Sequence, residues 1–238
     1  MLKIINLNKK YGDRYVLKNI NVSFNNTGIT IIVGANGSGK TTFFNCLVGM
    51  SSIEDNGSIF LDNYFVGDRK FKELVFYVPS DFFLPEFMTG FEYSNFVLSR
   101  YPRSNKEDFL KLIQILNIED YKKTLLSEYS FGMKKKIQIA VAIATHTKYI
   151  LADEIFSGLD FETTIIVQEI FKYISKKQHI IIVSHESNVV NKFSDKILLM
   201  KNGNLTPFKG SVDDISSLIR RENDVWNKIT EIQRYFDN

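Results

Sequence analysis

A glycine-rich segment at residues 34–42 constrains the fold more than any other part of the chain. It reads Gly-Ala-Asn-Gly-Ser-Gly-Lys-Thr-Thr and directly follows an apolar run at residues 29–33. Glycines let a backbone form a concave turn whose N–H groups converge, and the positive end of a following helix faces the same point. The pattern therefore predicts a strand, a polyphosphate-binding loop and a helix in succession.

The residues of this loop have distinct expected roles. Lys40 is predicted to place its positive charge on the β- and γ-phosphates of a nucleotide and to take part in catalysis, and the Thr41 hydroxyl is predicted to bind Mg²⁺. The residues expected to contact the nucleotide are Gly34, Ala35, Asn36, Gly37, Ser38, Gly39, Lys40, Thr41 and Thr42.

Composition argues against several classes of protein. The formal charge of +3 comes from 30 basic and 27 acidic residues spread along 238 positions, so no concentrated basic face and no nucleic-acid partner are expected. The single cysteine, Cys46, cannot form an internal disulfide, which favours the reducing cytoplasm. No apolar segment approaches the roughly 20 residues that a helix needs to cross a bilayer. A membrane function would therefore require a second chain that supplies the spans.

Short apolar runs and helical patterns alternate along the chain. Alternation at residues 20–24 predicts an antiparallel strand with one wet face, and Asn202-Gly203 predicts a tight hairpin. Uninterrupted runs predict parallel strands that are covered on both faces. These runs lie at residues 29–33, 75–78, 149–152 and 180–183.

Helices are predicted between these strands. At residues 104–116, Ser104 and Glu107 have the spacing of a capping box. At residues 161–177 an apolar face is expected from Ile165, Ile166, Ile170, Phe171, Tyr173 and Ile174. The expected fold is α/β, with a mainly parallel core sheet, an N-terminal antiparallel β subdomain and an inserted helical subdomain at about residues 81–135. The main domain is expected at residues 1–210 and a helical extension at residues 211–238.

Polar residues follow each parallel strand at its carboxyl end, the edge where such sheets bind ligands. Asp153 and Glu154 leave one buried strand together, where unpaired carboxylates would be costly. Asp153 is predicted to hold Mg²⁺ and Glu154 to deprotonate the water that attacks the γ-phosphate, while a solvated loop pair is the alternative. His185 follows another strand and can hydrogen-bond the γ-phosphate, although a strand-end histidine is more often a structural donor.

Together with the glycine loop, several motifs resemble those of the ATP-binding cassette (ABC) family of P-loop nucleotide hydrolases, from about residue 2 to residue 210. Tyr129-Ser130-Phe131-Gly132-Met133 is similar to the family signature Leu-Ser-Gly-Gly-Gln, and Ser157-Gly158-Leu159-Asp160 is similar to its D-loop. Tyr11 occupies the position of the aromatic that stacks on adenine, with Val16 beside it. His185 matches the switch histidine, which favours its catalytic role.

The resemblance implies a mechanism and a set of partners. In such proteins two cassettes, either copies or homologues, associate head to tail and enclose ATP and Mg²⁺ between them. Ser130, Gly132 and Asp160 would then contact the ATP that the other cassette binds. An integral membrane permease is the implied partner, and it would hold the cassette on the cytoplasmic face of the membrane.

Some positions depart from the family pattern. Ser80 stands where the Q-loop glutamine is usual, and it would reach Mg²⁺ through water. Phe131 and Met133 replace signature residues, and Ile155 replaces a proline. The Ser-x-Gly-Met-Lys form resembles the branch that powers bacterial drug, lantibiotic and peptide exporters. The lysines at residues 134–136 are expected on a solvated helix face, with a general attraction for nucleotide as the alternative.

The sequence leaves three functions to compare. The first is an ATPase subunit that drives a permease, which is expected to dock on the aromatics of the insertion. Packing within the insertion is the alternative for each of Phe82, Phe83, Phe87 and Phe91. The second is a soluble ABC-type ATPase, which would need a long coiled-coil insertion or a second cassette. The third is a weakly hydrolysing regulatory module, which Ser80 and the altered signature suggest.

Overall fold

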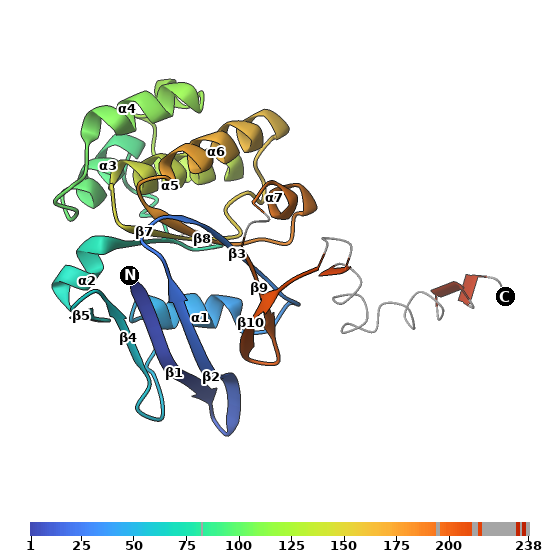
Figure 1. The fold of residues 1–238 in the computed structure, drawn as a ribbon. Helices are drawn as coiled ribbons and strands as arrows, with labels where there is room; N and C mark the ends of the chain where they lie inside the picture. The colour runs from blue at the N-terminus through green and yellow to red at the C-terminus, as the bar shows by residue number, and fades with distance from the viewer. Residues whose placement is uncertain (82, 194–195, 211–213, 216–231, 234, 237–238) are drawn as a thin grey trace.

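Two β-sheets carry the fold (Figure 1). The structure is a computed structural model that describes residues 1–238 except 82, 194–195, 211–213, 216–231, 234 and 237–238. An antiparallel sheet has the order β2-β1-β4-β5, and a mainly parallel sheet has the order β10-β9-β3-β8-β7-β6. The strands are β1 (Leu2–Tyr11), β2 (Arg14–Phe24), β3 (Gly28–Val33), β4 (Ser58–Leu61), β5 (Tyr64–Phe65), β6 (Val75–Val78), β7 (Tyr149–Asp153), β8 (His179–Val183), β9 (Ile197–Lys201) and β10 (Asn204–Phe208).

Helices cover both faces of the parallel sheet (Figure 1). On one face α1 (Lys40–Leu47) lies between the two sheets, and its Phe43 packs in one core with Leu2 and Ile181. The other face is covered mainly by α5 and α6, through residues such as Val167. The remaining helices are α2 (Arg69–Leu74), α3 (Gly90–Leu98), α4 (Lys106–Ile115), α5 (Phe131–Ala144), α6 (Phe161–Ile174), α7 (Ser187–Lys192) and the 3-10 turns η1 (Glu119–Tyr121) and η2 (Leu126–Glu128).

The uninterrupted apolar runs are explained by this double cover. In β7, Ile150 and Ala152 face the core beneath α5 and α6, whereas Tyr149 and Leu151 face the core around α1. Successive side chains of a strand point to opposite faces, so both faces must be apolar when both are covered. The four predicted parallel strands are confirmed.

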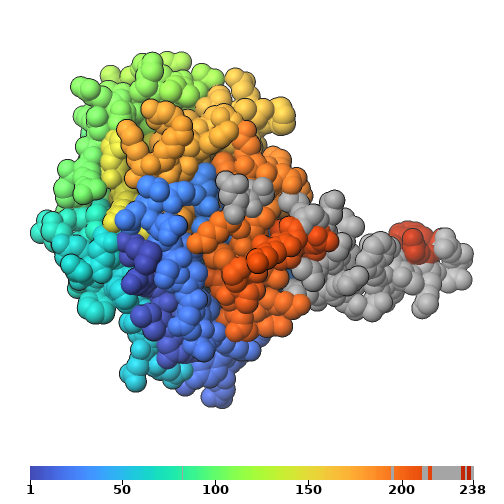
Figure 2. All heavy atoms as spheres, in the orientation of Figure 1, coloured from blue at the N-terminus to red at the C-terminus, as the bar shows by residue number. Residues whose placement is uncertain are grey.

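The antiparallel sheet is tied to the parallel one through the hairpin of β9 and β10. Figure 2 shows the N-terminal strands lying against this hairpin. The Lys18 N–H donates to the Gly203 carbonyl at 2.8 Å. Asn202 and Gly203 have φ values of 51° and 82°, as the predicted two-residue turn requires.

Two helix predictions were wrong in detail. α4 is capped by Asn105, whose side chain accepts the Glu107 N–H at 2.8 Å, whereas the Ser104 hydroxyl donates to the Leu98 carbonyl. Asparagine is as good a cap as serine, and here it is one residue nearer the helix. α6 ends at Ile174, before the predicted end at residue 177. Of the residues expected on its apolar face, Phe171 is buried and Ile166, Ile170 and Ile174 pack partly buried against the core, whereas Ile165 and Tyr173 are 45% and 67% exposed.

The expected C-terminal helices fall mostly outside the described residues. Of the apolar positions expected there, Ile215 is described and is buried against the core of α5 and α6. None of the helices that the structure describes is long and apolar enough to span a bilayer.

A buried histidine joins β8 to β3. His179 is 2% exposed, its Nδ1 lies 2.9 Å from the Thr27 carbonyl oxygen, and its Nε2 lies 3.0 Å from Thr30 Oγ1. The carbonyl must accept from Nδ1–H, so the neutral ring accepts the threonine proton at Nε2. Burial, opposed by the hydrogen bond to Thr27, lowers the pKa of His179 to about 4.

This depressed pKa predicts a loss of stability in mild acid. The unfolded chain takes up a proton on the histidine near pH 6.5, whereas the folded protein resists it until about pH 4. The contribution is therefore complete above pH 7, and about 2 kcal/mol of the free energy of unfolding is lost between pH 7.5 and pH 5. Urea denaturation of the parent and of His179→Gln at both pH values measures it, because all other titrating groups are shared. Equal pH dependence in the two proteins would contradict the assignment.

Candidate active site

The glycine loop leaves β3 and enters α1 as a tight cradle. Gly39, at φ 111°, caps α1, and a Cβ there would lie 3.0 Å from a Leu17 methyl group. A Cβ on Gly34 would overlap the Met200 carbonyl oxygen. Both positions therefore require glycine. The Ser38 hydroxyl is buried without a hydrogen-bond partner among the described residues, so a polar group in the cradle is open to a ligand oxygen.

Lys40 begins α1 and folds back over this cradle. Its ammonium donates to the carbonyl oxygens of Gly34 at 2.8 Å and Ala35 at 3.0 Å, and the residue is 7% exposed. Burial lowers the pKa of Lys40, while the charges of Glu154 and Asp153 oppose that change. The side chain thus holds a positive charge at the wall of the loop, as phosphate binding requires.

Asp153 ends β7 beneath α1. It is 1% exposed, and its Oδ2 accepts the Thr41 hydroxyl at 2.9 Å and the Tyr77 hydroxyl at 3.4 Å. Burial raises the pKa of Asp153 above its ordinary value. A hydroxyl and a carboxylate side by side supply the oxygen ligands that Mg²⁺ prefers, so these residues fit the ion that the sequence predicts.

Glu154 and His185 are brought into contact at the ends of β7 and β8. Glu154 Oε1 lies 3.1 Å from His185 Nε2, with the two side chains 25% and 34% exposed. Burial, followed by the charge of Asp153, raises the pKa of Glu154 to about 7. Burial, followed by the charge of Lys40, lowers the pKa of His185. A carboxylate whose pKa lies near neutral pH is suited to accept a proton from water.

One cavity of about 320 Å³ gathers most of the predicted site. Its walls are Val16, Asn36, Gly37, Gly39, Lys40, Thr41, Thr42, Ser80, Asp153, Glu154 and His185. Each of these residues was a candidate from the sequence. Tyr11 does not line it; this residue is 55% exposed at the end of β1, with the Lys9 ammonium 5.2 Å from its ring.

The signature and D-loop residues lie outside this cavity. Ser130 is exposed and caps α5 by accepting the Met133 N–H at 3.3 Å. Asp160 caps α6 by accepting the Thr163 N–H at 2.7 Å. Hydrogen bonds from the N–H and the hydroxyl of Thr163 lower the pKa of Asp160 to about 2. Gly132 lies beside the D-loop, since a Cβ there would come 3.3 Å from the Gly158 carbonyl oxygen. None of these groups lines the phosphate cavity of its own chain.

The lysines at residues 134–136 do not form the expected solvated face, since the side chains of Lys134 and Lys136 are 15% exposed and Lys135 is buried. Lys134 reaches Glu86 and Lys136 reaches Asp160, but Lys135 is 1% exposed and its ammonium donates to the Ser80 carbonyl at 3.0 Å. Ile139, four residues later on α5, is fully buried, and the carbonyl oxygens after β6 need donors. The sequence did not indicate which of the three consecutive lysines is buried.

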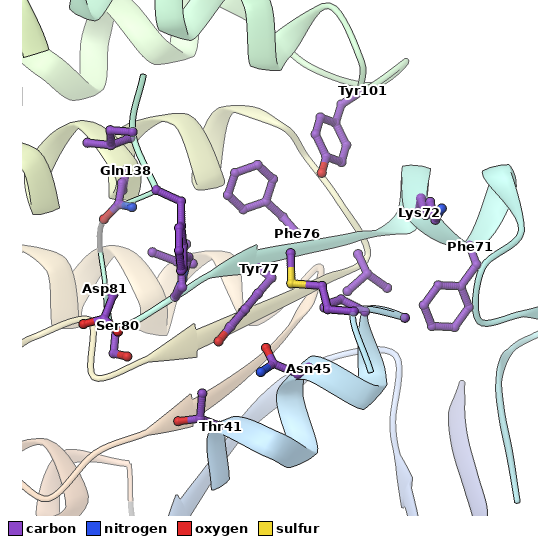
Figure 3. Close-up of a pocket in the computed structure, with 18 of the residues that line it drawn as sticks. Thr41, Asn45, Phe71, Lys72, Phe76, Tyr77, Ser80, Asp81, Tyr101 and Gln138 are labelled. Carbon is purple, nitrogen blue, oxygen red and sulfur yellow. The ribbon is translucent and has the colours of Figure 1, made fainter. Parts of the chain in front are cut away.

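Tyr77 was also missed. It lies in β6 next to β7, and its hydroxyl reaches the Asp153 carboxylate from the adjacent strand. The available signal was the penultimate position of Tyr77 in its strand, together with the polar group at the tip of its long side chain. Figure 3 shows this hydroxyl directed toward Thr41.

A larger groove of about 790 Å³ adjoins the site (Figure 3). Its walls come from the end of α1, from β6 and the residues after it, and from α3 and α5. They include Phe76, Tyr101, Asp81, Gln138 and the 80% exposed Phe83. Ser80 and Thr41 line both this groove and the phosphate cavity, so the two spaces share a wall.

Comparison with known proteins decides the family. The model of the family described as ABC transporter matches residues 17–157. The chain is 30% identical over 239 aligned residues to the phosphonates import ATP-binding protein PhnC of Fusobacterium nucleatum, with 93% of this chain and 97% of that protein covered. The chain belongs to the ABC transporter family. The cassette is therefore an ATP-binding subunit of the ABC type and an ATPase.

Further relatives agree with this assignment. The glutamine transport ATP-binding protein GlnQ of Geobacillus stearothermophilus is 30% identical over 217 residues, which cover 86% of this chain and 88% of that protein. A solved ATP-binding subunit of an ABC transporter has a TM-score of 0.80 at 22% identity, covering 94% of this chain and 93% of its own. A dimeric post-hydrolysis cassette bound to ADP and Pi has a TM-score of 0.76 at 22% identity, covering 89% and 99%. These structures confirm the predicted fold.

Lys40→Ala is expected to weaken ATP binding by the cassette about 10- to 100-fold, because the variant lacks the buried ammonium that faces the phosphates. Isothermal titration with Mg-ATP measures the change. Lys123→Ala removes an exposed lysine elsewhere and serves as the control, since it should keep the parental affinity. Unchanged affinity in Lys40→Ala would refute the phosphate-binding role.

Proposed function

We propose that this cassette hydrolyses ATP to drive a separate membrane permease, and that two cassettes enclose two ATP molecules head to tail. The observation that carries the proposal is the division of the site. Glu154, His185 and the phosphate loop lie together in one cavity, whereas Ser130 presents the exposed start of α5 outside it. Two half-sites on one chain become complete when each meets the other half on a second chain.

Within one cassette, the chemistry belongs to the edge where β7 and β8 end. Glu154 deprotonates the attacking water. The single ring N–H of neutral His185, 3.1 Å from that carboxylate in the structure, transfers its hydrogen bond to the γ-phosphate when ATP is bound. Lys40 leaves its carbonyl partners for the β- and γ-phosphates. Thr41 and Asp153 would hold Mg²⁺, with Ser80 contributing through water, and the ion would neutralise charge on the transferred phosphoryl group.

Across the interface, the second cassette contributes Ser130, Gly132 and Asp160. The Ser130 hydroxyl and the Gly132 N–H stand at the start of a 14-residue helix, where partial positive charge attracts phosphate. The fold likeness to a cassette solved as a dimer supports this arrangement. After hydrolysis and phosphate release these bonds are lost, and the two copies separate.

The permease is proposed to dock in the groove beside Ser80, which places the cassette on the cytoplasmic face of the membrane. Phe83 and Phe87 are 80% and 77% exposed, and such large apolar side chains are typical of interfaces. Phe91 is half-buried with the Lys106 ammonium 4.4 Å from its ring, and Phe82 lies outside the described residues. Relatives named for import or transport support a transport role.

The direction of transport stays a prediction. The pattern at residues 130–134 favours an exporter, whereas the relatives at 27–30% identity include proteins named for phosphonate and methionine import. The membrane chain that the cassette recruits decides between them.

The Glu154→Gln variant is expected to bind ATP yet hydrolyse it about 10²- to 10⁴-fold more slowly, because the amide cannot accept a proton from water. With ATP retained, the dimer should persist, and gel filtration with and without ATP should show it. The Lys40→Ala/Glu154→Gln double variant is the control and should stay monomeric. Hydrolysis at the parental rate by Glu154→Gln would displace this residue as the base.

Replacing the two exposed phenylalanines tests permease docking. Phe83→Ala/Phe87→Ala should reduce the membrane chain that co-purifies from detergent-solubilised cells by about tenfold, as expected for aromatic hot spots. Tyr173→Ala removes a 67% exposed aromatic from α6 and should retain the partner, as should Lys40→Ala. Full recovery of the membrane chain with the double variant would move the docking site elsewhere.

A further inference from the structure

Two departures from the family pattern meet at one lysine. Lys135 donates to the main-chain carbonyl of Ser80 at 3.0 Å and lies 3.5 Å from that of Pro79. Its ammonium is also 6.0 Å from the centre of the Phe131 ring, one helical turn earlier on α5. Ser80 replaces the usual glutamine and Phe131 replaces a usual glycine of the signature, so Lys135 contacts both altered positions.

The burial of Lys135 is costly without these partners. The residue is 1% exposed, and burial lowers the pKa of its ammonium, while the charges of Asp153, Asp81 and Glu154 oppose that change. A buried ammonium is tolerated when its protons are hydrogen-bonded and negative charge is near. The side chain is therefore held in place between α5 and the segment after β6.

That segment is the wall between the two spaces described above. Ser80 lines both the 320 Å³ phosphate cavity and the 790 Å³ groove. Figure 3, which draws the lining of the groove, shows Ser80 beside Asp81, with Thr41 and Tyr77 nearby in the same groove. A contact that fixes the Ser80 main chain therefore limits where the Ser80 hydroxyl can lie relative to the Thr41–Asp153 pair.

We propose that Lys135 is a positioning residue that holds the segment around Ser80 against the signature helix. Its hydrogen bond to the Ser80 main chain takes the place of a connection that a longer side chain at position 80 would make. The inference rests on the proposed role of Ser80 at the metal site. When a second cassette's nucleotide engages Ser130 at the start of α5, the Ser80 segment moves with that helix. Closure of the dimer and alignment of the metal ligands are then coupled within each chain.

Steady-state hydrolysis by the full chain tests the proposal. Lys135→Met keeps the length of the buried stem and removes the donors, and its kcat should fall about tenfold, as for loss of a hydrogen bond from a charged group. The KM for ATP should stay within about twofold, because the phosphate loop is untouched. Lys135→Arg, which donates to the same carbonyls, should recover most of kcat. Lys111→Met, which removes an exposed lysine on α4, is the control for lost charge.

A double-mutant cycle separates positioning through Ser80 from a general structural effect. Ser80→Ala should lower kcat and raise the Mg²⁺ concentration needed for half-maximal rate, and the Ser80→Ala/Lys135→Met double variant should lose no more of kcat than the more impaired of the two single variants. Additive losses, or a parental kcat in Lys135→Met, would overturn the inference. If the methionine variant does not fold, Lys135→Gln enters the same cycle. Hydrolysis at the parental rate by Glu154→Gln would instead contradict the proposed function. Failure of the Lys135 inference can therefore be distinguished from failure of the proposed function.

Discussion

The hydrogen bond between Thr41 and Asp153 is the contact on which the site depends. Asp153 is 1% exposed, and its Oδ2 lies 2.9 Å from the Thr41 hydroxyl. A hydrogen bond to a buried carboxylate contributes about 1.5–3 kcal/mol. One partner ends β7 and the other follows the glycine loop, so this bond holds the glycine loop and the Asp153–Glu154 pair in register. Displacing either would leave a carboxylate buried with fewer donors.

The order of strands in the parallel sheet brings those parts together. β3, β8, β7 and β6 are neighbours in that order, although the chain visits β3 first and β8 last among them. Their carboxyl ends deliver the glycine loop, His185, the Asp153–Glu154 pair and Ser80 to one edge in a row. Parallel strands with both faces covered leave this edge as the open place for a charged ligand. The same burial shifts the pKa of Glu154 to about 7.

The helical insertion adds a second connection across this edge. α5 begins at the signature and carries Lys135 one turn further, where the ammonium holds the Ser80 carbonyl. Tyr77 meets Asp153 from the other side of the same segment. The wall between the phosphate cavity and the groove is thus held by side chains from α5 and by a strand of the sheet.

The sequence by itself determined the parallel strands, the glycine loop and the identity of the residues that line the cavity. These features depend on residues adjacent in the chain, namely on glycines where the backbone turns tightly and on uninterrupted apolar runs. It placed the start of α4 one residue early and counted the exposed Ile165 and Tyr173 with the apolar face of α6, since near-equivalent caps and apolar positions compete locally. Only the tertiary structure decided the contacts of Lys135, Tyr77 and the Glu154–His185 pair. These contacts join segments that lie tens of residues apart in the chain. Lys135 is the buried lysine of the three because packing brings main-chain carbonyl oxygens within reach of its ammonium.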